Sequence, residues 1–184
     1  MDAMGEHPAV LDDASVARAL RDARLVALDV DGTLTDGVIA YVEGFELQRF
    51  CVHDGQGLVW LRERGVAVAW ITGRGCAATR RRADELGVRL FERCGPKAAV
   101  LERVQAELGL APERTIAMGD DLPDLALATR AALFACPADA RPEVRARAQL
   151  VTRAAGGRGA VRELAELVLR AQGAWEALAR EAAR

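Results

Sequence analysis

Short apolar runs alternate along this chain with stretches whose apolar residues recur at helical spacing. The apolar runs predict strands at 25–29, 66–71, 88–91, 115–118 and 132–135, with a weaker strand at 149–151. The intervening stretches predict helices at 56–64, 76–86, 97–108, 122–129 and 142–147, and a long helix from about 160 onward. Because strands that alternate with helices in this way usually pair in parallel, we expect an α/β fold built on a doubly wound parallel sheet.

One segment interrupts the alternation soon after the first strand. Two apolar-rich runs flank Val42-Glu43-Gly44, a pattern typical of a β-hairpin, so we expect a hairpin insertion at 38–52 that hangs over the strand ends. Residues 1–13 are predicted to be disordered, and residues 153–184 to form a glycine-rich segment and a C-terminal helix. With no visible linker, the 184 residues are expected to form one domain.

Composition and charge exclude several kinds of partner. The net charge is −2, and the cluster Arg80-Arg81-Arg82 is interpreted as the solvated face of a helix, so no nucleic-acid partner is expected. Residues 1–13 show no signal-peptide pattern. The most continuous apolar strand, Val66–Ile71, is far shorter than the ~20 residues of a membrane span. We therefore expect a soluble protein without a membrane partner.

Rare residue types exclude further chemistries. Ser15 is the only serine and the chain has two histidines, which argues against a Ser-His-Asp hydrolase and a histidine-rich zinc site. The four cysteines lie far apart without a C-x-x-C pair and are expected to be reduced. Lys97 is the only lysine among 25 basic residues. Its compact ammonium group suits a buried phosphate site in a way that a planar guanidinium does not.

Two carboxylates follow the first predicted strand. Asp29 and Asp31 are spaced i, i+2, so they would share one face, and Gly32 allows the backbone to turn sharply after them. Their mutual repulsion would be relieved by a hard divalent cation such as Mg²⁺, which prefers oxygen ligands. The alternative is an ordinary surface turn, where Asp bonds its own backbone.

Three more polar features fall at the ends of predicted elements. Thr72-Gly73-Arg74 follows the second strand, Lys97 opens a helix, and Gly119-Asp120-Asp121 follows a later strand. Taken singly, they could be a helix cap, a solvated first-turn residue and a turn. Because the carboxyl ends of parallel strands lie along one edge of the sheet, all of them are expected to converge with the Asp pair there. Their convergence favours a functional site.

With these motifs the chain resembles the haloacid dehalogenase superfamily of aspartate-nucleophile phosphohydrolases. The four features occupy its four motifs in order and spacing. Over about residues 24–172 the likeness extends to the 3-deoxy-D-manno-octulosonate 8-phosphate phosphatases, which lack a cap domain. The segments that carry it are 31–37, 54–57, 71–74 and 151–163. Two positions depart from that pattern: His53 stands where members often have Arg, and Thr33 where some have Val.

The resemblance implies a mechanism and a set of site residues. Asp29 would attack phosphorus to give an aspartyl-phosphate, while Asp31 protonates the leaving group and later activates water. Mg²⁺ would be held by Asp29, the backbone carbonyl of Asp31, and Asp120, with Asp121 ordering ligands or water. The phosphoryl oxygens would be bound by a second group of residues, which comprises Thr72, Lys97 and the backbone near Gly32 and Gly73.

The resemblance also implies an assembly and a cellular setting. Without a cap, the 38–52 hairpin would need another subunit to enclose the site, and members of the family imply a homotetramer. The resemblance also implies a role in lipopolysaccharide synthesis in the bacterial cytoplasm. Arg74 and Arg158 would contact the sugar acid, and the glycine-rich tail would enter a neighbouring site. We therefore expect residues 153–184 to lie outside the core, so that their removal would spare the sheet.

Other functions remain open at this point. Within enzymes, the alternatives are a phosphatase for a nine-carbon keto-sugar acid 9-phosphate and a broad sugar-phosphate phosphatase. A phosphoacceptor signalling domain with Asp54 as acceptor is a different class, but Asp54 follows a poor strand end and leaves the acids at 120–124 without a role. A non-catalytic phosphosugar-binding protein would be expected to have lost Asp29 or Asp31.

Overall fold

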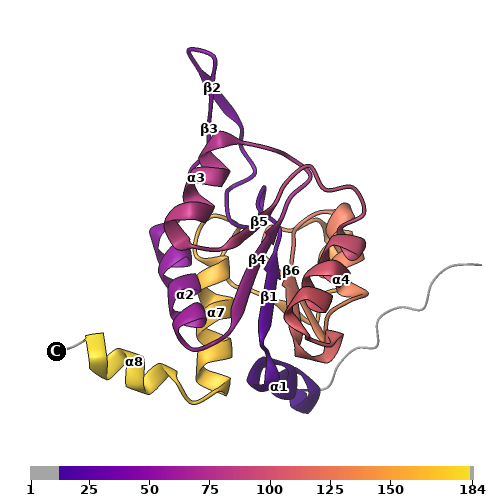
Figure 1. The fold of residues 1–184 in the computed structure, drawn as a ribbon, viewed down its shortest axis with the longest axis vertical. Coiled ribbons are helices and arrows are strands. Elements are labelled where there is room, and N and C mark those ends of the chain that lie inside the picture. The colour runs from indigo at the N-terminus through magenta and orange to yellow at the C-terminus, as the bar shows by residue number, and fades with distance from the viewer. Residues whose placement is uncertain (1–12, 183–184) are drawn as a thin grey trace, which may run out of the picture.

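A six-stranded parallel sheet forms the centre of the protein in the computed structural model, which describes residues 13–182 (Figure 1). The strand order is β5-β4-β1-β6-β7-β8, and every pair is parallel. The strands are β1 (Leu25–Leu28), β4 (Ala67–Ile71), β5 (Arg89–Phe91), β6 (Thr115–Met118), β7 (Leu133–Cys136) and β8 (Leu150–Val151). The chain leaves β1 toward one edge through β4 and β5 and then returns to build the other edge, which confirms the doubly wound fold.

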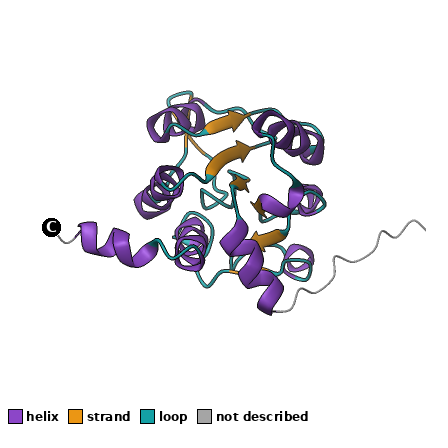
Figure 2. Ribbon diagram, turned by 60° about the horizontal axis from the view of Figure 1, so that its bottom comes forward, coloured by secondary structure: helices purple, strands orange, loops and turns teal. Residues whose placement is uncertain are grey.

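Helices cover both faces of the sheet (Figure 2). One apolar cluster joins Val26 and Leu28 of β1 to α1 (Asp13–Asp22), α2 (Val52–Glu63), α3 (Ala77–Leu86) and α7 (Ala160–Ala171). The other joins Leu25 and Ala27 to α4 (Lys97–Leu108), α5 (Leu125–Ala128) and α6 (Pro142–Arg145). Alternate residues of β1 thus face opposite layers, as a strand buried on both sides requires.

The predicted helices differ from the structure near the two ends of the chain. Residues 1–12 lie outside the described part, but Asp13, which we expected to be disordered, begins α1. The C-terminal helix is not continuous: α7 ends at Ala171, Gly173 adopts a left-handed φ of 72°, and α8 (Trp175–Ala182) follows. Glycine permits this backbone conformation without a steric cost, which explains the break.

The predicted hairpin is present and shorter than expected. Strands β2 (Ala40–Val42) and β3 (Phe45–Leu47) pair antiparallel and project beyond the carboxyl edge of the sheet (Figure 1). Helix α2 begins at Val52, four residues before the predicted start, so the second strand cannot extend to 52. Two short 3-10 helices, η1 (Pro112–Arg114) and η2 (Leu122–Asp124), complete the elements. None of the helices in residues 13–182 is long and apolar enough to cross a membrane.

Helix α7 corrects the expectation that residues 153–184 lie outside the core. Its apolar stripe, which includes Leu164, Val168 and Leu169, is buried in the same cluster as β1 and packs against α2. We therefore now expect that removing this segment would disrupt the packing of the sheet rather than spare it. The glycines before α7 suggested an extended tail, but the apolar spacing within 160–171 is that of a core helix.

Candidate active site

Strand β1 delivers Asp29 to the carboxyl edge of the sheet. The backbone N–H of Asp29 still donates to the Met118 carbonyl on β6 at 2.9 Å, so the ladder fixes its position. Beyond it, the Val30 carbonyl accepts from the backbone N–H of Thr33, Leu34 and Thr35, which closes a tight loop. The Asp29 side chain is buried. The chain therefore presents a rigid carboxylate where the strand ends.

Lys97 is the buried cation of the site. It begins α4, and its Nζ donates to Asp29 and to Asp124 Oδ1. Burial acts to lower the pKa of Lys97, but the neighbouring carboxylates of Asp29 and Asp124 raise it above its ordinary value. The lysine therefore stays protonated, and its charge lies against the predicted nucleophile.

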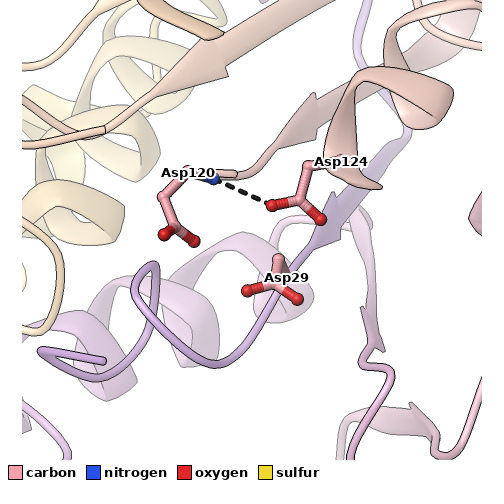
Figure 3. A group of neighbouring side chains, drawn as sticks. All are labelled: Asp29, Asp120 and Asp124. Atoms are coloured by element: carbon pink, nitrogen blue, oxygen red, sulfur yellow. Dashed lines mark hydrogen bonds between the residues drawn. The ribbon is translucent and has the colours of Figure 1, made fainter. Parts of the chain in front are cut away.

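Three carboxylates gather around this position (Figure 3). Oxygen atoms of Asp29, Asp120 and Asp124 lie within 4.8 Å of one another. Burial and the charge of Asp124 raise the pKa of Asp29 well above its usual range despite Lys97, and the same two causes raise the pKa of Asp120 to about 7. One lysine does not balance three carboxylates, so the group fits a hard divalent cation that prefers oxygen ligands.

Asp124 is the member of this group to which sequence reasoning gave no role. Its Oδ2 accepts from the backbone N–H of Asp120 and of Asp121 at 3.0 and 3.1 Å, and its Oδ1 faces Lys97. The carboxylate thus fixes the loop after β6 and the lysine together. The spacing of Asp121 and Asp124, typical of a capping box, was the signal that could have drawn attention to it.

The side chains of Asp31 and Asp121 lie outside the three-carboxylate group. Asp121 Oδ1 accepts from the Leu122 backbone N–H at 2.8 Å and caps η2. Asp31 Oδ2 accepts from Thr72 Oγ1 at 3.1 Å, and Oδ1 accepts from Gln48 Nε2 at 2.8 Å. The two carboxylates after β1 therefore have different surroundings, which is what two different chemical roles require.

The segment after β4 forms the second wall of the site. Thr72 Oγ1 accepts from the backbone N–H of Arg74 at 3.0 Å, and the Arg74 guanidinium pairs with Glu46 on the hairpin at 2.7 Å. An open cavity of about 240 Å³ lies between the walls and is lined by the side chains or backbone of Asp29, Asp31, Thr72, Gly73, Arg74, Lys97, Asp121, Pro123 and Asp124. The structure thus brings most of the predicted site residues to one cavity.

Two predicted substrate-binding residues, Gly32 and Arg158, are not part of the lining of this cavity. Gly32 has a φ of 99°, and a Cβ at this position would overlap the Asp120 carboxylate, so the site requires a glycine there. Arg158 is exposed, and its guanidinium lies 3.7 Å from Asp36 Oδ2. The glycines before Arg158 contact residues 30–35 of their own chain, the predicted catalytic loop: the backbone N–H of Gly157 donates to the Thr33 carbonyl at 3.0 Å.

Asp54 has a structural position that excludes the phosphoacceptor hypothesis. It lies in the first turn of α2, is 1% exposed, and accepts from the backbone N–H of Arg162 and Gly159 at 2.7 and 3.3 Å. Burial raises the pKa of Asp54. A carboxylate enclosed at the start of α7 offers no path to a phosphodonor, and its role is to join α2 to α7.

Comparison with known proteins agrees with this geometry. Residues 90–164 match the family model of haloacid dehalogenase-like hydrolases. The chain is 40% identical over 143 residues to the 3-deoxy-D-manno-octulosonate 8-phosphate phosphatase of Escherichia coli K12, which covers 76% of each protein. The crystal structure of the Yersinia pestis phosphatase is 38% identical with a TM-score of 0.86, covering 88% of this chain and 89% of that one.

A further crystal structure, of the 3-deoxy-D-manno-octulosonate 8-phosphate phosphatase of Moraxella catarrhalis, holds a magnesium ion, a phosphate ion and a KDO molecule. It is 35% identical with a TM-score of 0.89, and the match covers 92% of this chain and 99% of that one. The fold and the site therefore define a haloacid dehalogenase-like hydrolase. Within this class, the chain belongs to the family of 3-deoxy-D-manno-octulosonate 8-phosphate phosphatases.

Proposed function

We propose that this protein is a Mg²⁺-dependent phosphatase that hydrolyses 3-deoxy-D-manno-octulosonate 8-phosphate to the free sugar acid and phosphate. The observation that carries the proposal is the placement of Asp29: a buried carboxylate at a strand end, paired with Lys97 and open to the 240 Å³ cavity. Asp31 lies at the same cavity in a separate hydrogen-bonded setting. Membership of the family supports the substrate.

The reaction takes place in two displacement steps. In the first, a carboxylate oxygen of Asp29 forms a bond to phosphorus, the ester P–O bond breaks, and Asp31 gives its proton to the departing oxygen. In the second, Asp31, now a carboxylate, takes a proton from water as that water attacks phosphorus. The aspartyl P–O bond breaks, phosphate leaves, and both aspartates return to their starting states. Lys97 and Thr72 stabilise the charge on the phosphoryl oxygens.

The donor set indicates which residues would hold Mg²⁺. Asp124 already accepts hydrogen bonds on both oxygens, from Lys97 and from two backbone N–H groups, so it acts mainly by orienting its neighbours. Asp29 and Asp120 keep free oxygen lone pairs and would be the principal carboxylate ligands. The Asp31 backbone carbonyl and Asp121 remain the further contributors predicted from sequence. When bound, the ion neutralises charge that develops on the phosphoryl group.

A homotetramer is the assembly that we propose. The hairpin exposes apolar side chains that a solvated hairpin would not be expected to carry: Tyr41 is 73% exposed and Phe45 is 76% exposed, beside Val38, Val42 and Leu47. Burying such a patch between subunits would remove this surface from water and close the open side of the cavity. Arg158, which lies near the Asp36 side chain, remains a candidate partner for the substrate carboxylate in this assembly. We propose the cytoplasm as the location of the reaction.

A panel of phosphate esters tests the substrate. With Mg²⁺ present, kcat/KM is expected to be highest for 3-deoxy-D-manno-octulosonate 8-phosphate, ahead of the nine-carbon keto-sugar acid 9-phosphate and of hexose phosphates. The catalytic residues contact only the phosphate, so the ranking depends on Arg74, Arg158 and neighbouring subunits. If a hexose phosphate or the nine-carbon ester ranks first, the substrate assignment is wrong even though the hydrolase assignment stands.

A further inference from the structure

The hairpin strand β3 and the residue that follows it present polar side chains to the active site. Residues alternate along this segment: Phe45 and Leu47 are exposed, whereas Glu46 and Gln48 are half-buried and turn inward. Glu46 pairs with Arg74, and the side chain of Gln48 reaches Asp31. The hairpin is therefore joined to the proposed acid of the reaction through a direct hydrogen bond.

The Gln48 amide is held at both ends. Its Nε2 donates to Asp31 Oδ1 at 2.8 Å, and its Oε1 accepts from Thr79 Oγ1 at 2.5 Å. Thr79 lies on α3 and is only 2% exposed, so its hydroxyl has a fixed position. Because Thr79 donates to the amide oxygen, the amide nitrogen faces Asp31 Oδ1, an oxygen that can accept even when Oδ2 carries a proton. Three residues from three separate segments thus form one hydrogen-bonded chain.

The other two groups that contact the Asp31 side chain, Thr72 and Arg74, also have other partners or roles. Thr72 Oγ1 donates to Asp31 Oδ2, but a hydroxyl has a single proton, and Thr72 is also the proposed donor to the phosphoryl oxygens. Arg74 Nε lies 3.6 Å from Asp31 Oδ1, while the same guanidinium holds Glu46 at 2.7 Å. When substrate occupies the cavity, Gln48 is the donor to Asp31 that has no second task.

We propose that Gln48 is a positioning residue that holds the Asp31 carboxyl group in line with the leaving oxygen, with Thr79 as its anchor. The inference rests on the proposed function, in which Asp31 transfers the proton. A carboxyl group that rotates freely would meet the leaving oxygen less often, and the loss would be greatest for esters whose departing oxygen needs a proton. Gln48 acts through Asp31 and contacts neither phosphorus nor the leaving oxygen.

Comparison of two substrates separates positioning from general damage. Because kcat/KM reports the steps up to departure of the leaving group, it is measured for the sugar-acid phosphate, a poor leaving group, and for p-nitrophenyl phosphate, a good one. Gln48→Leu is expected to lower kcat/KM about tenfold for the sugar-acid phosphate and less than about threefold for the aryl ester. Gln48→Glu keeps an acceptor for Thr79 but loses the donor to Asp31. It is expected to show the same larger loss of kcat/KM on the sugar-acid phosphate than on the aryl ester.

Two further variants complete the test. Thr79→Val removes the anchoring hydroxyl at nearly constant volume. It is expected to reproduce part of the difference between the losses of kcat/KM on the two substrates. This variant keeps the inference testable if Gln48→Leu fails to assemble. Gln172→Leu is the matched control: its Nε2 donates to the Ala23 carbonyl at 3.0 Å, at the opposite edge of the sheet. It loses one amide bond of the same kind and should leave both kcat/KM values unchanged.

The result has three readings. A larger loss on the sugar-acid phosphate than on the aryl ester, with unchanged mass by light scattering, supports the positioning role. Equal losses on both substrates, or no loss on either, overturn it while leaving the phosphatase proposal intact. If the wild-type protein with Mg²⁺ hydrolyses neither ester, the proposed function itself fails, and the role of Gln48 fails with it.

Discussion

Gly156→Ala tests whether the glycine-rich segment supports the catalytic loop of its own chain. A Cβ at position 156 would overlap the carbonyl oxygen of Gly32 and lie 2.7 Å from its carbonyl carbon and 3.1 Å from the Thr35 carbonyl oxygen. These neighbours are backbone atoms of the loop that follows Asp31, so the added methyl cannot be accommodated by a side-chain rotation. Either this loop or the segment before α7 must move.

The expected cost follows from this overlap. Overpacking of a close-packed region typically costs about 1–3 kcal/mol. At roughly 2–4 °C per kcal/mol for a protein of this size, Tm should fall by about 2–12 °C. A shift of about 1 Å at the catalytic loop can lower the rate by up to ~10²-fold, so kcat/KM should fall as well. Both effects should appear together.

Thermal unfolding by circular dichroism and steady-state kinetics with Mg²⁺ measure the two effects. Gly95→Ala is the control, because a Cβ there meets nothing within 4 Å and its backbone shows no positive φ. It should leave Tm within about 2 °C of wild type, as ordinary surface substitutions do. If Gly156→Ala keeps both the wild-type Tm and the wild-type kcat/KM, the packing of this segment against the catalytic loop is refuted.

Three other changes have defined outcomes. Lys97→Met should lower kcat at least about 100-fold by removing the cation at the phosphoryl site, and it should cost about 3 kcal/mol in the metal-free protein, measured by urea unfolding. Burial and the charge of Asp124 raise the pKa of Asp120 to about 7, so protons compete with Mg²⁺ for this carboxylate below that pH. The Kd for Mg²⁺, measured by titration calorimetry, should therefore increase as the pH falls below 7. A Kd that does not change with pH would contradict this. Truncation before Gly156 should abolish cooperative unfolding because α7 is lost from the core. Truncation after Gly173 removes α8 but keeps α7, and should leave a folded protein. If the protein truncated before Gly156 still folds, the core role of α7 is refuted.

The sheet and the polar residues that follow its strands could be predicted from the sequence. Apolar runs mark buried strands regardless of their partners, and parallel topology then brings the following polar residues to one edge, which is why Asp29, Thr72 and Lys97 could be placed together. The superfamily resemblance then supplied the roles, since spacing alone left ordinary turns and caps open.

Contacts that depend on distant segments could not be predicted. Asp124 meets Lys97 across 27 residues, and Gln48 meets Asp31 across 17, and neither spacing has a local signature. The packing of Gly156 against the Gly32 backbone of its own chain could not be predicted for the same reason, because the two residues are far apart in the sequence. The core position of α7 was missed for a different reason: the apolar stripe was visible, but the glycines before it suggested an extended tail that enters a neighbouring site.

Identification of the phosphorylated residue tests the central claim most directly. Wild-type protein is mixed with Mg²⁺ and 3-deoxy-D-manno-octulosonate 8-phosphate, quenched in acid within the first turnover, digested and analysed by mass spectrometry. We predict one phosphoryl group on Asp29, and none in Asp29→Asn, which should remain folded and inactive because an amide cannot act as the nucleophile. A phosphoryl group on another residue, or wild-type turnover by Asp29→Asn, would contradict the account.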